Sequence, residues 1–325
     1  GLDFLRGGAR PPQPMIMGFI DQMRAEGHAV ESVCRVLRQE GCQIAARTYR
    51  AWRHRSASAR DTSDAVLLNV LHDLVGTPEG LYGRRKMTAW LRRQGHQVGA
   101  GRVDRLMRVA GMNGVRRGRP VRTTIPAKDG HRAGDLLNRD FTAAAPNTKW
   151  VADFTYVRTW AGFVYVAFVL DCYSQKVVAW HAATSKTTPL VLTPLRIALW
   201  ERDRAGHPVQ PGELIAHSDA GSQYTSLRFA EHLAAEGIAA SIGTVADAYD
   251  NALMECVIGL YKTECITTTI FHDSPYKTIA DVEYATAGWV EWYNNRRLHS
   301  SLAMTTPAEY ETAYYANLNR ELAPA

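Results

Sequence analysis

Residues 150–157 alternate between two sets of side chains with the two-residue period of a β-strand. Two more strand-like runs follow after short turns, at 163–171 and 176–182, so the three together predict an antiparallel meander. The pattern then changes to helix, strand, helix, strand and helix, at 187–203, 213–219, 226–236, 238–242 and 251–264. Three meandering strands followed by this alternation predict an α/β fold, in which helices flank a mixed sheet.

Three acidic residues occupy defined places in this pattern. Asp153 lies inside the first strand, and Asp219 ends the short strand that begins near residue 213. Glu255 lies on the last helix, where 100° per residue places it opposite the apolar stripe and on the same side as Lys262. Because strand ends of a sheet commonly carry the chemistry, we expect the three carboxylates to converge.

Converging carboxylates suit Mg²⁺ or Mn²⁺, since these ions prefer oxygen ligands, and two such ions can assist phosphodiester chemistry. Taken singly, an Asp at a strand end is usually a turn or cap residue, and a Glu on a polar helix face is usually solvated. Asp171 ends the second strand, and we interpret it as a turn or salt-bridge residue. Asp247 and Asp250 compete with Glu255 for the third position, although both are typical of loops or helix caps.

Charge is unevenly distributed along the chain. The formal net charge is +6, but residues 1–149 carry +13 and residues 150–325 carry −7. A basic front half is typical of a protein that binds a polyanion such as double-stranded DNA. No stretch approaches the roughly 18 apolar residues of a membrane span, and no signal peptide is visible, so we expect a cytoplasmic, nucleoid-associated protein.

The front half is predicted to be helical. Residues 1–58 form an N-terminal helical module, either a DNA-binding helix-turn-helix or a basic dimerisation bundle. Residues 64–120 have the spacing of a second helix-turn-helix domain, and residues 121–146 form a linker. The arginines expected to contact DNA in this half are Arg102, Arg105 and Arg108 on one helix, and Arg116 and Arg117 in the basic segment after it.

The catalytic core is expected to span residues 147–310, followed by a C-terminal tail at 311–325. Further candidate DNA contacts lie in this half. Gln223 and Tyr224 come just after Asp219, with a turn packed on the sheet as the alternative reading. A polar cluster near the end of the core is a candidate for phosphate contacts, and its members are Asn294, Arg296, Arg297 and His299.

Several sequence motifs give these residues a family context: W-x-x-D-x-T-Y-V, H-S-D-x-G-S-Q-Y-T-S, D-N-A-x-x-E, L-Y-K-T-E and Y-N-x-R-R-L-H. From about Leu81 to Tyr310 the chain resembles the OrfB-type DDE transposases of the bacterial insertion-sequence family numbered three, which carry a retroviral-integrase-like core. It departs from the usual pattern at Met254 and Cys256, in the loop GTVADAY, and at Ala303, where a glycine is usual.

The resemblance implies a ribonuclease-H-like fold and a catalytic triad of Asp153, Asp219 and Glu255 that binds two Mg²⁺ or Mn²⁺ ions. It places the family's basic residue at Lys262. It also implies 3′ cutting at terminal inverted repeats, joining to target DNA, and a homo-oligomer in a synaptic complex. An upstream-frame partner protein is frequent in the family, and the sequence leaves open whether residues 1–55 belong to such a frame.

Two other functions fit parts of the sequence. A catalytically silent DNA-binding remnant would keep the basic half but lose the chemistry; the presence of all three acids argues against it. A general two-metal nuclease acting on RNA–DNA hybrids would keep the acids, and the basic helix-turn-helix modules argue against that alternative.

Overall fold

The computed structural model describes residues 11–55, 58–116, 136–137, 140–219, 223–243, 251–273 and 275–322. The chain divides into two compact units, Gly1–Val66 and Leu67–Ala325. Within the described residues, no helix has the length and apolar character to cross a membrane.

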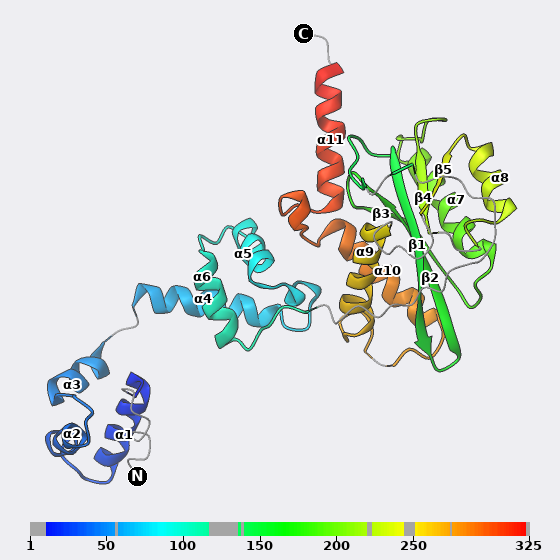
Figure 1. Cartoon of the computed structure of the whole chain (residues 1–325). Helices are drawn as coiled ribbons and strands as arrows, with labels where there is room; N and C mark the ends of the chain where they lie inside the picture. The colour runs from blue at the N-terminus through cyan, green and yellow to red at the C-terminus, as the bar shows by residue number, and fades with distance from the viewer. Residues whose placement is uncertain are drawn as a thin grey trace. The chain divides into compact units, whose positions relative to one another are not determined.

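The first unit is helical, as predicted for the N-terminal module, and contains α1 (Gln13–Ala25), α2 (Val30–Gln39) and α3 (Ala46–His54) (Figure 1). Their apolar faces form a small core that includes Ile16, Ile20, Leu37 and Tyr49. The arginines of α3 remain exposed, namely Arg47, Arg50 and Arg53. Whether this basic surface binds DNA or a second copy stays a prediction.

The second unit begins with a helical domain. Helix α4 (Ala59–Asp73) runs across the boundary between the units and is followed by the 3-10 turn η2 (Pro78–Leu81), α5 (Arg84–Arg93) and α6 (Ala100–Val109). The α5 stripe of Met87 and Leu91 is buried together with Val103 and Leu106 of α6, as their spacing predicts. Their cluster extends into the core that follows.

A five-stranded sheet forms the centre of that core. Its strands are β1 (Lys149–Thr159), β2 (Gly162–Asp171), β3 (Val177–Ala183), β4 (Ile215–Ser218) and β5 (Ala239–Ile242), in the spatial order β3-β2-β1-β4-β5. The first three strands are antiparallel, and β4 and β5 pair in parallel beside β1. This topology confirms the predicted ribonuclease-H-like mixed sheet.

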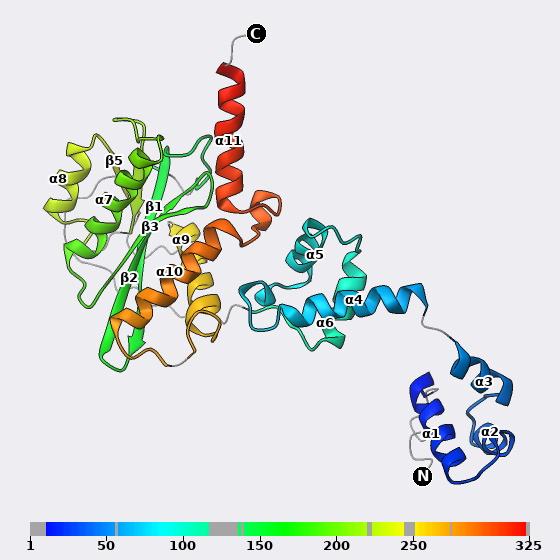
Figure 2. The same ribbon diagram turned by 180° about the vertical axis from the view of Figure 1, so that it is seen from behind.

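Helices cover both faces of the sheet (Figures 1 and 2). Helices α7 (Thr188–Arg204) and α8 (Leu227–Ala235) lie on one face, and α9 (Ala252–Leu260) and α10 (Ile279–Asn295) lie on the other. The side chains of strand β2 alternate between the two faces. Ala167 and Val169 pack in the apolar cluster under α7 and α8, and Phe168 and Leu170 pack in the cluster under α9 and α10.

Two elements differ from the prediction. The helix expected at 251–264 ends at Leu260 and continues as a π-helix, η4 (Tyr261–Ile266). The expected C-terminal tail is mostly helix, α11 (Pro307–Leu322), which follows the short 3-10 turn η5 (Ser300–Leu302). Between η5 and α11, Ala303 has φ 52° in the left-handed region that favours glycine.

A buried charge cluster joins the sheet to α11. Asp171 is fully buried at the end of β2, and its Oδ1 accepts the backbone N–H of Tyr173 at 2.9 Å. Its Oδ2 lies 3.4 Å from the Arg202 guanidinium, which also pairs with Glu311. The interpretation of Asp171 as a turn and salt-bridge residue is confirmed.

Candidate active site

Sheet register brings Asp153 and Asp219 together. Strand β4 pairs in parallel with β1 so that Ala152 lies opposite Ser218. Asp153 and Asp219 are therefore the next residues along two neighbouring strands, whose backbones lie about 4.8 Å apart. Asp153 is half-buried, and its Oδ1 accepts the backbone N–H of Phe154 at 2.7 Å.

Asn251 connects the helix of Glu255 to the same strand. It occupies the N-cap position of α9 but makes no capping hydrogen bond with its side chain. Instead its Nδ2 donates to the carbonyl oxygen of Ala152 at 3.3 Å, directly before Asp153. Glu255 lies one turn further along α9 and is exposed. Asn251 was not singled out from the sequence; its place in the D-N-A-x-x-E motif is the signal that could have revealed this role.

The pKa of Asp153 indicates which charged groups lie near its carboxyl group. Burial raises the pKa of its carboxyl group well above the ordinary value, and the charges of Asp219 and Glu255 raise that pKa further. The Phe154 N–H and the ammonium of Lys262 lower it. Both other carboxylates and the lysine are thus close enough to act on Asp153, and the like charges form an arrangement that a cation would relieve.

Lys262 approaches the carboxylates from the π-helix that extends α9. Its Nζ lies 5.1 Å from the centre of the Tyr156 ring on β1. Burial lowers the pKa of Lys262, and the charge of Asp153 raises it. A π-turn changes the direction of the side chains that follow it and is frequent at functional sites, which the helical spacing alone did not reveal.

Tyr224 lies in the apolar layer near Asp153 and Asp219. Its side chain is 3% exposed and packs against Phe154 and Phe229, with ring centres 6.2 Å and 5.5 Å away. Burial raises the pKa of its hydroxyl well above the ordinary value, and the charges of Asp153 and Asp219 raise it further. Gln223, beside it, donates from Nε2 to the Lys186 carbonyl at 3.0 Å. These contacts match the alternative that the turn packs on the sheet.

The three acids supply oxygen donors only, which suits a hard divalent cation. In the described part of the chain, no group of three His, Cys, Asp or Glu side chains is close enough to hold a metal ion as it stands. The segments next to Asp219 and Glu255, at 220–222 and 244–250, lie outside the described residues, and so do Asp247 and Asp250. The fit to a cation therefore rests on donor chemistry and on the charge coupling at Asp153.

Comparison with known proteins identifies the family. Two models, each described as an integrase core domain, match residues 143–248 and 236–307, and a model of an HTH-like domain matches residues 66–120. Over 280 residues the chain is 44% identical to the transposase assigned to insertion element IS986/IS6110 of Mycobacterium tuberculosis, covering 86% of this chain and 99% of that protein. This chain belongs to the insertion-sequence transposases.

A second transposase supports this assignment. The transposase for insertion element IS629 of Shigella sonnei is 42% identical over 311 residues, which cover 94% of this chain and 99% of that protein. Among solved structures, the HTLV-2 integrase catalytic core in complex with magnesium aligns with TM-score 0.38 and 16% identity, over 52% of this chain and 98% of that one. The sequence matches confirm the predicted OrfB-type DDE transposase, an enzyme with an integrase core and an HTH-like domain.

The HTH-like domain of the transposase presents part of the expected DNA-binding surface. On α6, Arg108 is exposed and pairs with Asp104 one turn away, while Arg102 and Arg105 are half-buried. Arg116 is exposed after the helix, and Arg117 lies outside the described residues. DNA contacts by these arginines stay a prediction.

Most of the residues that were expected to contact phosphates near the end of the core are buried. Asn294, Arg297 and His299 are 8%, 4% and 4% exposed, and each binds a partner inside the transposase. Asn294 exchanges two hydrogen bonds with the backbone of Val177, at 2.9 and 2.8 Å. Arg297 pairs with the buried Glu264 at 2.6 Å. Because buried side chains cannot reach phosphates, only Arg296, whose side chain is 53% exposed, remains a candidate contact.

Proposed function

We propose that this transposase cuts the ends of its insertion element to leave 3′ hydroxyl groups and joins those ends to target DNA. Asp153, Asp219 and Glu255 act together beside the C-terminal end of β4, next to the central strand β1. The observation that carries the proposal is the parallel register of β1 and β4, which makes Asp153 and Asp219 neighbours. The charges of Asp219 and Glu255, which raise the pKa of Asp153 beyond the effect of burial, agree with it. Buried like charges cost free energy unless a cation compensates them.

The three carboxylates are proposed to hold two Mg²⁺ or Mn²⁺ ions. When bound, such ions activate a water or hydroxyl nucleophile and stabilise the leaving 3′ oxygen. Asp153 contributes from a rigid strand, and Asn251 holds the helix of Glu255 beside it at Ala152. Lys262 is proposed to contact a phosphate of the bound DNA, because its half-buried ammonium group is close enough to Asp153 to act on the pKa of that acid.

The basic half is proposed to hold the terminal inverted repeats. Arg102, Arg105, Arg108, Arg116 and Arg117 would bind mainly phosphates, with few base contacts. The net charge of +13 on residues 1–149 supports this division of labour. We further propose that the transposase acts at nucleoid DNA as a homo-oligomer that brings two ends together, with an upstream-frame protein as a candidate partner.

Substitution of one acid tests the proposal. Asp219→Asn in the full chain should lower Mn²⁺-dependent nicking of labelled terminal DNA by at least about a thousandfold, since the transition-state charge loses its support. Affinity for that DNA should stay within about twofold, because the substituted residue is not among the proposed phosphate contacts. Asp203→Asn, an exposed carboxylate on α7, is the matched control and should nick at the wild-type rate.

Three outcomes would contradict the proposal. Nicking by Asp219→Asn at the wild-type rate would remove that carboxylate from the chemistry. A wild-type protein that binds terminal DNA but never cuts it would favour the silent remnant. Preferential cleavage of an RNA–DNA hybrid over inverted-repeat duplex would favour a general two-metal nuclease.

A further inference from the structure

The loop between α4 and α5 has a fixed shape. Thr77 donates from Oγ1 to the Leu74 carbonyl at 2.9 Å, and Gly80 donates its N–H to the Thr77 carbonyl at 3.0 Å. A Cβ on Gly80 would lie 2.5 Å from the Leu74 carbonyl oxygen, and one on Gly114 would lie 2.5 Å from the Gly83 backbone. Only glycine allows these two close approaches, so the loop is held from both sides.

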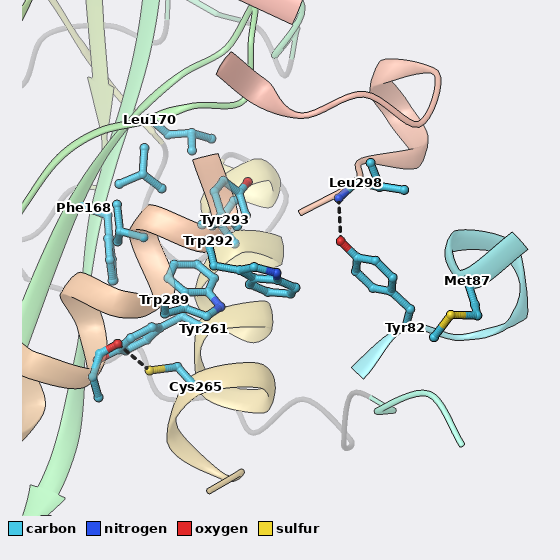
Figure 3. Packing of buried hydrophobic residues seen from close by; sticks show 14 of the residues in the cluster. Tyr82, Met87, Phe168, Leu170, Tyr261, Cys265, Trp289, Trp292, Tyr293 and Leu298 are labelled. Atoms are coloured by element: carbon cyan, nitrogen blue, oxygen red, sulfur yellow. Dashed lines mark hydrogen bonds between the residues drawn. The ribbon is translucent and has the colours of Figure 1, made fainter. Parts of the chain in front are cut away.

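This loop presents Tyr82 to the catalytic core. The Tyr82 hydroxyl donates to the Arg296 carbonyl at 3.2 Å and accepts the backbone N–H of Leu298 at 3.0 Å (Figure 3). Tyr82 and Leu298 are both 2% exposed. One hydroxyl therefore binds the backbone on both sides of Arg297, and a buried backbone group that loses such a partner costs about 1–3 kcal/mol.

Glu79 adds a second contact from the same loop. Trp292 is fully buried, and its Nε1 donates to Glu79 Oε1 at 3.1 Å. The rings of Tyr82 and Trp292 stack with centres 6.0 Å apart at an angle of 29°. We call the five residues Glu79, Tyr82, Trp292, Arg296 and Leu298 the Tyr82 joint.

The core side of the joint is rigid. Arg297, between the two backbone groups that Tyr82 binds, is fixed to Glu264 of the π-helix by bonds of 2.6, 2.9 and 3.1 Å. Glu264 also accepts the Trp289 Nε1–H at 3.3 Å. On the rim, Arg93 of α5 pairs with Glu309 and donates to the Met304 carbonyl at 3.1 Å. The Y-N-N-R-R-L-H motif thus holds helices from two domains.

We propose that the Tyr82 joint is a positioning device, which fixes the HTH-like domain on the catalytic core so that a DNA end held by this domain reaches the carboxylates in one register. This inference rests on the proposed function. It gives the Y-N-N-R-R-L-H motif a role in joining domains in place of the phosphate contacts expected from its sequence. End recognition and cutting then depend on one preset distance.

The Tyr82→Phe variant tests the joint because it removes one oxygen atom and leaves the ring. Terminal-DNA affinity should stay within about twofold, while nicking at the wild-type position should fall about tenfold and new cuts should appear at neighbouring positions, since misplaced reactants lose rate. Tyr284→Phe is the matched control, a tyrosine 74% exposed on α10, and should cut as the wild type does.

Arg93→Ala gives a second test at the half-exposed rim, where folding is not at risk, and should shift the cutting pattern in the same direction. Wild-type rate and cutting position in both variants would overturn the joint. If the wild type itself does not cut, the proposed function fails, and hydrogen exchange then decides on the joint. Faster exchange in α5 relative to β1 in Tyr82→Phe would support it, and unchanged exchange would overturn it.

Discussion

Two sets of buried or half-buried carboxylates in this transposase differ in what neutralises them. Glu264 faces Arg297 at 2.6 Å and the Trp289 indole at 3.3 Å, and Asp171 and Glu311 share the buried Arg202. Asp153, by contrast, has two other acids among its strongest electrostatic neighbours. The protein itself compensates the first set, whereas at the proposed catalytic site the Phe154 N–H and Lys262 are the described groups that act against the negative charge on Asp153.

The difference separates structural charge from functional charge. A buried ion pair with its partners in place holds elements together, as Arg297 and Glu264 hold the end of α10 on the π-helix. Like charges that the fold keeps close reduce its stability and persist where a ligand repays the cost. The ligand that we propose for this site is a divalent cation together with DNA.

The largest expected effect comes from breaking a compensated pair. Arg297→Ala leaves Glu264 buried without its cation and should lower the free energy of unfolding by about 3–5 kcal/mol, as measured by urea denaturation. Arg296→Ala, at the exposed neighbouring position, is the control and should change it by less than about 1 kcal/mol. An equal loss in both variants would show that Arg297 does not differ from a surface arginine.

A smaller effect on stability is expected from Lys86, which lies near the pair of Arg297 and Glu264. Its Nζ is 5.7 Å from the centre of the Tyr82 ring. Burial and the charge of Arg297 lower the pKa of Lys86, the charge of Glu264 raises it, and together they bring it from 10.5 to about 7. Between these two values the unfolded chain binds one more proton than the folded chain, so stability increases as pH rises.

Urea denaturation at pH 7.5 and pH 9 checks this sign. The wild type should gain stability over that interval relative to Lys86→Met, which has no proton to lose. The same pH dependence in both proteins would contradict a lowered pKa of the half-buried Lys86. Other groups titrate in the same pH interval. Their contributions cancel only when the stability change of Lys86→Met is subtracted from that of the wild type.

Local patterns predicted much of this arrangement. The strand period placed Asp153, and the turn after residue 219 placed Asp219 at a strand end, so their meeting followed from sheet topology. The partner of Arg297 could not be predicted in this way. Glu264 lies 33 residues earlier in the chain, and its pairing depends on how α10 packs on the π-helix. A run of polar residues was therefore interpreted as a DNA contact.

Other misses have related causes. The spacing of apolar residues continues from α9 into the π-helix with nearly the period of an α-helix. The pattern at 251–264 therefore predicted one uninterrupted helix. Helix α11 has a mixed surface without a strong apolar stripe, and its docking depends on Glu311 reaching Arg202, 109 residues away. Ala303, which stands where the family usually has glycine, adopts a left-handed conformation that was not predicted.

The measurement that tests the central comparison most directly is thermal unfolding of the wild type and Asp153→Asn, with and without Mn²⁺. Without metal, Asp153→Asn should be at least as stable as the wild type, because one of three repelling charges is gone. Mn²⁺ should then raise the Tm of the wild type and raise that of Asp153→Asn much less, since binding to the folded state stabilises it. An equal rise in both proteins, or a destabilised Asp153→Asn without metal, would contradict the account.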